Sequence, residues 1–164
     1  MNSLDNVHAF CMAIGEREGT IDLPAVDYAQ TANIGGFSLV EHIRQQTGYV
    51  ATQPNAAPTP TPIARLDSLT LPKTPDLIKI DTEGFDLNVL TGGGALFERS
   101  HYPPILFEAW NFEWFKAEQQ KVFDFLKHLG YAVSHVFADD YVAQHPQHAV
   151  HINIIIDGKG GLNM

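Results

Sequence analysis

The stretch LIKIDTEGFDLNVL, residues 77–90, carries the clearest structural pattern in this chain. An apolar strand ends at Asp81, and a short helix is expected from Glu83 to the end of the stretch. Asp86 adds a third acidic group at the same turn. Because ligands bind beyond the carboxyl ends of strands in open α/β sheets, we expect binding or acid–base chemistry at this turn.

Downstream of this stretch the chain alternates strands and helices. Residues 105–108 predict a strand that ends in an acidic residue, and an apolar stripe predicts a helix over residues 112–129, closed by Gly130. Residues 131–137 and 149–156 suggest a final antiparallel pair of strands. The order of elements predicts an α/β fold with a mixed sheet that has an antiparallel strand near its end.

Upstream, the expected elements are shorter and less regular. Residues 7–14 predict a buried strand, residues 20–23 a short return strand, and residues 39–46 one or two helical turns. Residues 53–62, QPNAAPTPTP, hold four prolines, which fit neither a helix interior nor a central strand. We expect an internal Pro-rich loop there, inside a single domain that spans residues 1–164.

Composition limits the class of partner. A chain of 164 residues with 45% hydrophobic and 18% charged content is typical of one globular domain. The formal net charge of −9 argues against nucleic acid and anionic membranes, which bind clustered Lys and Arg. We therefore expect no nucleic acid and no membrane among its partners.

The chain shows no targeting or disulfide pattern. Cys11 is the single cysteine in the sequence, so no internal disulfide can form. The first ten residues lack a basic region followed by an apolar one, and the apolar run 152–156 is too short to span a bilayer. We expect a cytoplasmic protein.

With its flanks, the opening stretch resembles the FkbM family of S-adenosylmethionine-dependent methyltransferases. Similar segments lie at residues 6–23, 66–69 and 103–108, and the resemblance covers roughly residues 6–157 in the right order. Within the stretch the matching residues are Lys79, Ile80, Asp81, Glu83, Gly84, Asp86, Val89, Leu90 and residues 92–94.

The resemblance implies the C-terminal two-thirds of a Rossmann-like class I methyltransferase fold. It implies methyl transfer from S-adenosyl-L-methionine to a hydroxyl of a small molecule or sugar. The family's Gly-rich turn for the methionine end of the cofactor, and its ribose-binding acid, have no counterpart here. The cofactor contacts that the resemblance leaves are Met12, Ala13, Gly15 and Asp81.

Four residues are candidates for catalysis: Asp81, Glu83, Glu108 and Lys79. A base must reach the acceptor hydroxyl directly or through one water, and Asp81 and Glu83 are the candidates for that role. Asp81 can instead be a helix N-cap, and Glu83 and Asp86 can complement the helix dipole. We expect Lys79 to pair with a carboxylate such as Glu108, either structurally or to orient a substrate.

A metal role is open at two places. His145, His148 and His151 recur every three residues, but Pro146 interrupts any helix, so we expect a surface loop there rather than a metal site. A divalent ion held by Asp81 and Glu108 is the second possibility.

Other functions stay open as well. If the family's first third is missing, the chain is a catalytically inactive fragment or an interaction module. In the usual strand order of this fold, the missing first strand lies beside the strand that ends at Asp81, so a homodimer through that exposed sheet edge is expected to be possible. A metal hydrolase would depend on the histidines alone.

Overall fold

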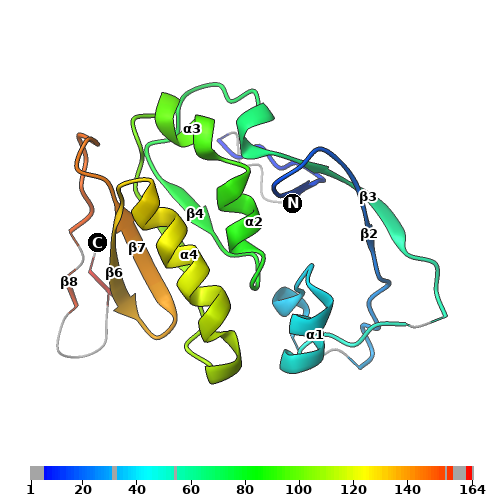
Figure 1. The fold of residues 1–164 in the computed structure, drawn as a ribbon. Helices are drawn as coiled ribbons and strands as arrows, with labels where there is room; N and C mark the ends of the chain where they lie inside the picture. Colours follow the sequence, from blue (N-terminus) through cyan, green and yellow to red (C-terminus); the bar gives the residue numbers. More distant parts are fainter. Residues whose placement is uncertain (1–5, 31–32, 54, 154, 157–161, 164) are drawn as a thin grey trace.

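The computed structural model describes residues 6–30, 33–53, 55–153, 155–156 and 162–163. They form a mixed α/β structure with two mixed sheets and four α-helices (Figure 1). The strands are β1 (Ala13–Ile14), β2 (Gly19–Leu23), β3 (Thr59–Ala64), β4 (Ile78–Ile80), β5 (Ile105–Glu108), β6 (Ala132–Phe137), β7 (Asp140–Gln144), β8 (Ile155–Ile156) and β9 (Leu162–Asn163). The α-helices are α1 (Glu41–Thr47), α2 (Asp86–Thr91), α3 (Gly94–Arg99) and α4 (Lys116–His128), with 3-10 turns at Ile34–Gly36, Leu66–Ser68 and Glu113–Phe115.

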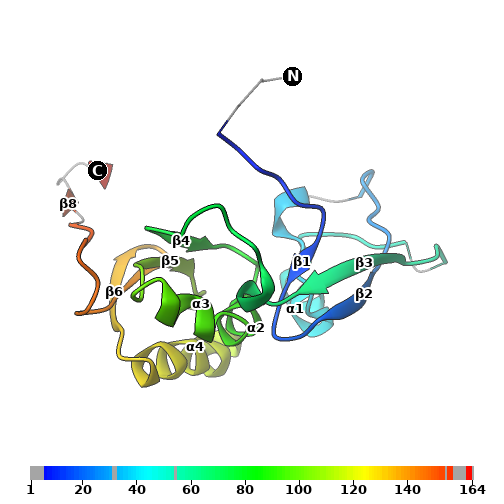
Figure 2. The ribbon, with the colours of Figure 1, turned by 90° about the horizontal axis from the view of Figure 1, so that it is seen from above.

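The larger sheet has the order β4-β5-β7-β6. β4 and β5 are parallel, and β7 runs antiparallel to both β5 and β6, so the predicted mixed sheet with a late antiparallel strand is confirmed. Helices α2, α3 and α4 cover one face of this sheet (Figures 1 and 2). Among the described strands β4 has one neighbour, so the strand before Asp81 lies at the edge of its sheet.

The main core lies between this sheet and its helices. Leu90, Phe97, Ile105 and Leu126 are fully buried there. The apolar stripe of α4 faces the core as predicted, and the helix ends where Gly130 adopts a φ of 91°. The Tyr131 N–H then donates to the Leu126 carbonyl at 3.0 Å, which closes the last turn.

The prediction of the last strand pair is wrong in its second member. β6 pairs with β7, whereas the described residues from 149 to 153 form no strand, residue 154 lies outside the described residues, and β8 pairs with β9. The turn between β6 and β7 contains Ala138, whose φ of 48° is unusual for a residue other than glycine. Since Ala-Asp is not a typical two-residue hairpin turn, the sequence carried no hairpin signal at this point.

The smaller sheet has the order β1-β3-β2 and lies beside α2 (Figure 2). Gly15 follows β1, and a side chain at Gly92 would come within 2.0 Å of the Gly15 carbonyl oxygen, so the two backbones touch. The predicted buried strand over residues 7–14 is wrong, because only Ala13–Ile14 forms a strand. Val7 and Phe10 are 57% and 65% exposed, and the segment before β1 leads away from the other elements (Figure 2).

The Pro-rich segment is also not wholly a loop. Its residues from 59 onward belong to β3, which lies between β1 and β2; Pro54 lies outside the described residues. Pro60 and Pro62 are opposite Asp22 and Thr20, the alternate positions of the ladder, which need no N–H donor toward β2. β1 pairs only with the end of β3, beyond both prolines, so neither proline costs a hydrogen bond in the sheet.

The longest α-helix among the described residues, α4, has 13 residues. No helix in this part of the chain combines the length and apolar character that crossing a bilayer requires.

Candidate functional site

The site begins with the turn between β4 and α2. The Phe85 N–H donates to the Thr82 carbonyl at 3.1 Å, and both central residues of this turn have positive φ, 51° at Glu83 and 86° at Gly84. Gly84 suits that conformation, but Glu83 is held there at a cost of about 1–2 kcal/mol. A side chain on Gly84 would also come within 2.5 Å of Ile43 Cδ1, so the turn packs closely against α1.

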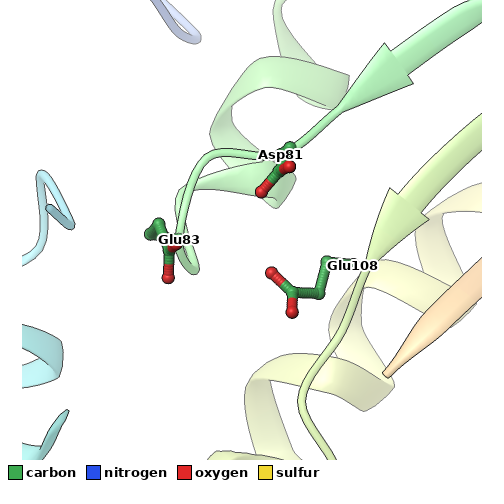
Figure 3. Close-up of side chains that lie close together, drawn as sticks. All are labelled: Asp81, Glu83 and Glu108. Atoms are coloured by element: carbon green, nitrogen blue, oxygen red, sulfur yellow. The ribbon is translucent and has the colours of Figure 1, made fainter. Parts of the chain in front are cut away.

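Three acidic side chains meet at this turn. Ile80 is paired with Phe107 in the parallel ladder, so Asp81 and Glu108 end neighbouring strands at one edge of the sheet. Their carboxylates and that of Glu83 each offer an oxygen within 4.8 Å of the others. Figure 3 shows the three side chains pointing toward a common space. The structure thus brings three of the four predicted catalytic residues together, and we call them the acidic cluster.

Burial and mutual repulsion raise the pKa values of two acids in the acidic cluster. Partial burial raises the pKa of Glu83, and the nearby Asp81 and Asp86 raise it further. The pKa of Glu108 is raised by burial and by Glu83 and Asp81, while a hydrogen bond from Trp110 opposes the shift. Carboxylates with raised pKa values are better proton acceptors, so Glu83 and Glu108 suit general base chemistry.

Lys79, the fourth predicted residue, pairs with Asp81 and not with Glu108. Its Nζ lies 2.5 Å from Asp81 Oδ2, and this hydrogen bond is the main cause of its raised pKa. The two side chains are 62% and 46% exposed, so the pair contributes little to stability. The alternative role of Asp81 as a helix N-cap is wrong, because Phe85 holds that position in α2 and no side chain caps the helix.

Asp86 is a buried acid that the sequence suggested only as a partner of the helix dipole. It is 3% exposed, and burial raises its pKa to about 6. Its Oδ2 accepts from the Gly84 N–H at 3.2 Å. The Thr82 hydroxyl is near enough to lower the pKa of Asp86 but lacks hydrogen-bond geometry, so Asp86 Oδ1 and Thr82 Oγ1 are both buried without a partner.

A cavity of about 280 Å³ opens beside the acidic cluster. α1, the turn before α2, the end of β5 and the first turns of α4 form its walls. Glu108 and Asp86 both line it, so it connects the acidic cluster with the buried acid. Its apolar lining includes Ile43, Phe115 and Val122.

Two residues that sequence reasoning missed hold the segment after Glu108. Gln119 is buried in α4 and donates to the carbonyls of Ala109 and Trp110 at 2.9 and 3.2 Å. The Asp139 carboxylate accepts from the Asn111 N–H at 2.9 Å. The signal for Gln119 was a polar residue within the apolar stripe of a helix, between Phe115 and Val122.

The chain was compared with protein families, curated proteins and solved structures. The model of the methyltransferase FkbM domain matches residues 1–133. The chain belongs to the FkbM methyltransferase family. No curated protein and no solved structure matches it.

FkbM-type domains generally use S-adenosylmethionine, and the residues of this chain fit that cofactor poorly. A side chain on Gly15 would meet Ile63 Cδ1 at 2.8 Å and Phe85 Cε1 at 3.1 Å, so Gly15 is packed against the protein itself. Met12 and Ala13 are half-buried at β1, and Asp81 is engaged by Lys79. The described residues therefore supply carboxylates but no glycine cradle for the cofactor.

For a metal, this FkbM-family chain offers the acidic cluster and not the histidines. Among the described residues the acidic cluster is the group of potential ligands close enough to hold an ion. His145 is 7% exposed and stacks on Tyr102, so the expected surface loop is wrong for this residue. His148 instead contacts the His101 carbonyl at 3.0 Å, and His151 is exposed.

Proposed function

We propose that this chain takes part in S-adenosylmethionine-dependent methyl transfer to a hydroxyl of a small molecule or sugar. The FkbM domain carries the general activity, and the acidic cluster beside a cavity supports the hydroxyl acceptor. The strand order β4-β5-β7-β6, with β7 antiparallel, supports a Rossmann-like class I sheet as the scaffold.

In this proposal the acidic cluster receives the acceptor hydroxyl and takes its proton. Glu108 and Glu83 are the bases, because their pKa values are raised and their carboxylates face the same space. Asp81, held by Lys79, orients the acceptor oxygen. Positioning of the acceptor by these residues then contributes much of the rate.

The second candidate is an interaction module without catalysis. The packed environment of Gly15 favours it, since the space beside this glycine is filled by Ile63 and Phe85. Calorimetric titration of the chain with S-adenosylmethionine separates the two candidates. Weak binding or none, the result that the packing of Gly15 favours, would support the interaction module, whereas a micromolar dissociation constant would support methyl transfer by this chain.

The test of the proposed chemistry is methyl transfer from labelled S-adenosylmethionine to a panel of hydroxyl compounds that includes sugars. Glu108→Gln and Glu83→Gln each remove a base with little change of shape, so a loss of about 10²- to 10⁴-fold is expected for the residue that accepts the proton. Asp76→Asn is the matched control, because that acid is exposed and paired with Lys73 away from the acidic cluster. Undiminished transfer in both Gln variants would exclude the acidic cluster as the base.

A further inference from the structure

The cavity beside the acidic cluster has an unusual charge balance. Its lining includes Asp86, Glu108 and Glu118 but no lysine or arginine. His42 is the other titratable residue in the lining, and it is exposed. The rest of the wall combines apolar side chains with Gly84 and Asn88. A mostly apolar cavity with three acids and no strong cation in its wall suits a positively charged ligand.

The three acids differ in whether the protein already satisfies them. Glu118 is bound by Lys121, whose Nζ lies 2.9 and 3.1 Å from its two carboxylate oxygens. Glu108 is half-buried, and Trp110 lowers the pKa of its carboxyl. Asp86 is the most buried of the three, and its Oδ1 has no hydrogen-bond partner. A buried carboxylate oxygen without a partner is costly, and a cationic donor in the cavity would remove that cost.

We propose that this cavity binds a small molecule that carries a protonated amine next to an apolar group, with the ammonium on Asp86. The apolar group packs against Ile43 and Phe115. Because Glu108 belongs both to the cavity and to the acidic cluster, a hydroxyl on the same molecule reaches the bases. The occupant is thus an amino alcohol, a narrower acceptor class that rests on the proposed function; the amine site itself does not.

A purely structural role explains Asp86 less well. α2 has six residues, so its dipole rewards an acid in the first turn only weakly. Oδ2 accepts the Gly84 N–H, and the Thr82 hydroxyl lies near the carboxyl but without hydrogen-bond geometry, so Oδ1 has no hydrogen-bond partner. Burial raises the pKa of Asp86 to about 6, the direction that opposes ionisation, whereas a stabilising carboxylate has a lowered pKa.

Binding of benzylamine and of benzyl alcohol to the whole chain tests the amine site without the cofactor. The two probes share size and aromatic ring, and at about pH 8 the first is a cation while the Asp86 carboxylate is ionised. A charge-assisted hydrogen bond predicts that benzylamine binds about tenfold tighter or more in calorimetry. Equal affinities, or no binding of either probe, would overturn the amine site.

Two variants decide which acid is responsible. Asp86→Asn should remove the preference for benzylamine, while Glu118→Gln should keep it, because Glu118 lines the same cavity but is satisfied by Lys121. Loss of the preference in both variants, or in neither, contradicts the assignment. Amide shifts of Gly84, Asn88 and Ala109 on titrating the unaltered chain provide an independent readout, and shifts elsewhere would also contradict it.

These binding results stand apart from the methyl-transfer assay. If benzylamine binds through Asp86 but the Gln variants of the acidic cluster transfer methyl groups normally, the proposed function fails and the amine site remains. If the Gln variants lose transfer while benzylamine shows no preference, the function remains and the amine site fails.

Discussion

The two sheets of this chain differ in how their side chains are buried. The larger sheet packs against three helices, and Leu90, Phe97 and Ile105 at that interface are fully buried. In the smaller sheet every residue of β2 is half-buried or exposed, and Ile63 of β3 is the hydrophobic residue in these three strands that is nearly inaccessible. The acidic cluster belongs to the larger sheet, and its turn also contacts α1.

This difference indicates that the larger sheet, which also holds the acidic cluster, carries most of the stability. A site needs carboxylates held within a fraction of an ångström, and strand ends anchored in a dense core provide that. The smaller sheet meets the region of the larger one through backbone contact between Gly15 and Gly92.

The largest effect is expected from side-chain truncation in the dense core. Phe97→Ala should lower the free energy of unfolding by about 3–5 kcal/mol, because it removes a ring from a fully buried position. Ile21→Ala in half-buried β2 should cost about 1 kcal/mol. Urea unfolding of both variants measures the contrast, and equal losses would show that the two sheets are packed alike.

A smaller effect on the free energy of unfolding, which depends on pH, is expected from replacing the buried acid Asp86. Asp86→Asn should stabilise the fold at neutral pH, because the raised pKa of about 6 means that ionising Asp86 costs folding energy. The ordinary pKa of an aspartate is 3.8, so between about pH 4 and 6 the folded state retains a proton that the unfolded state has lost, and stability falls as the pH rises. The gain is therefore at most about 3 kcal/mol above that window and absent below it. Urea midpoints of Asp86→Asn and the unaltered chain should differ above about pH 6 but not below about pH 4. An equal difference at both would contradict the raised pKa of Asp86.

The smallest effect concerns the contact between α1 and the turn before α2, which carries Glu83 of the acidic cluster. Gly84→Ala should cost about 1–2 kcal/mol through its positive φ and its approach to Ile43 Cδ1. Ile43→Val deletes that methyl group, so the double variant should lose less than the sum of the single ones. Gly94→Ala is the control, since a side chain there meets open space. Strict additivity would show that α1 does not press on the turn.

The larger sheet could be predicted because its elements have regular patterns. The strand before Asp81, the strand ending in Glu108 and the stripe of α4 each combine periodicity with a clear end. Two predictions for the smaller sheet failed because they depended on local composition without a periodic pattern. Residues 7–11 are apolar in part but exposed, and prolines marked a loop where alternate ladder positions accept them.

Only part of the candidate site could be predicted from the sequence. Strand order placed Asp81 and Glu108 together, because both follow from the ends of adjacent parallel strands. The sequence could not show that Glu83 turns back toward them, since that depends on a positive φ that glutamate rarely adopts. Nor could it show the full burial of Asp86, although an acid on the same face as Val89 and Leu90 was the available signal.

The two prolines of β3 also affect how this chain behaves among other chains. On the side away from β2, Pro60 and Pro62 lie where β1 no longer covers the strand, and there they present no N–H groups. A strand without donors cannot extend a sheet into a neighbouring molecule, which is the first step of cross-β aggregation. The feature that disguised this strand in the sequence therefore protects its exposed half from aggregation during folding and storage.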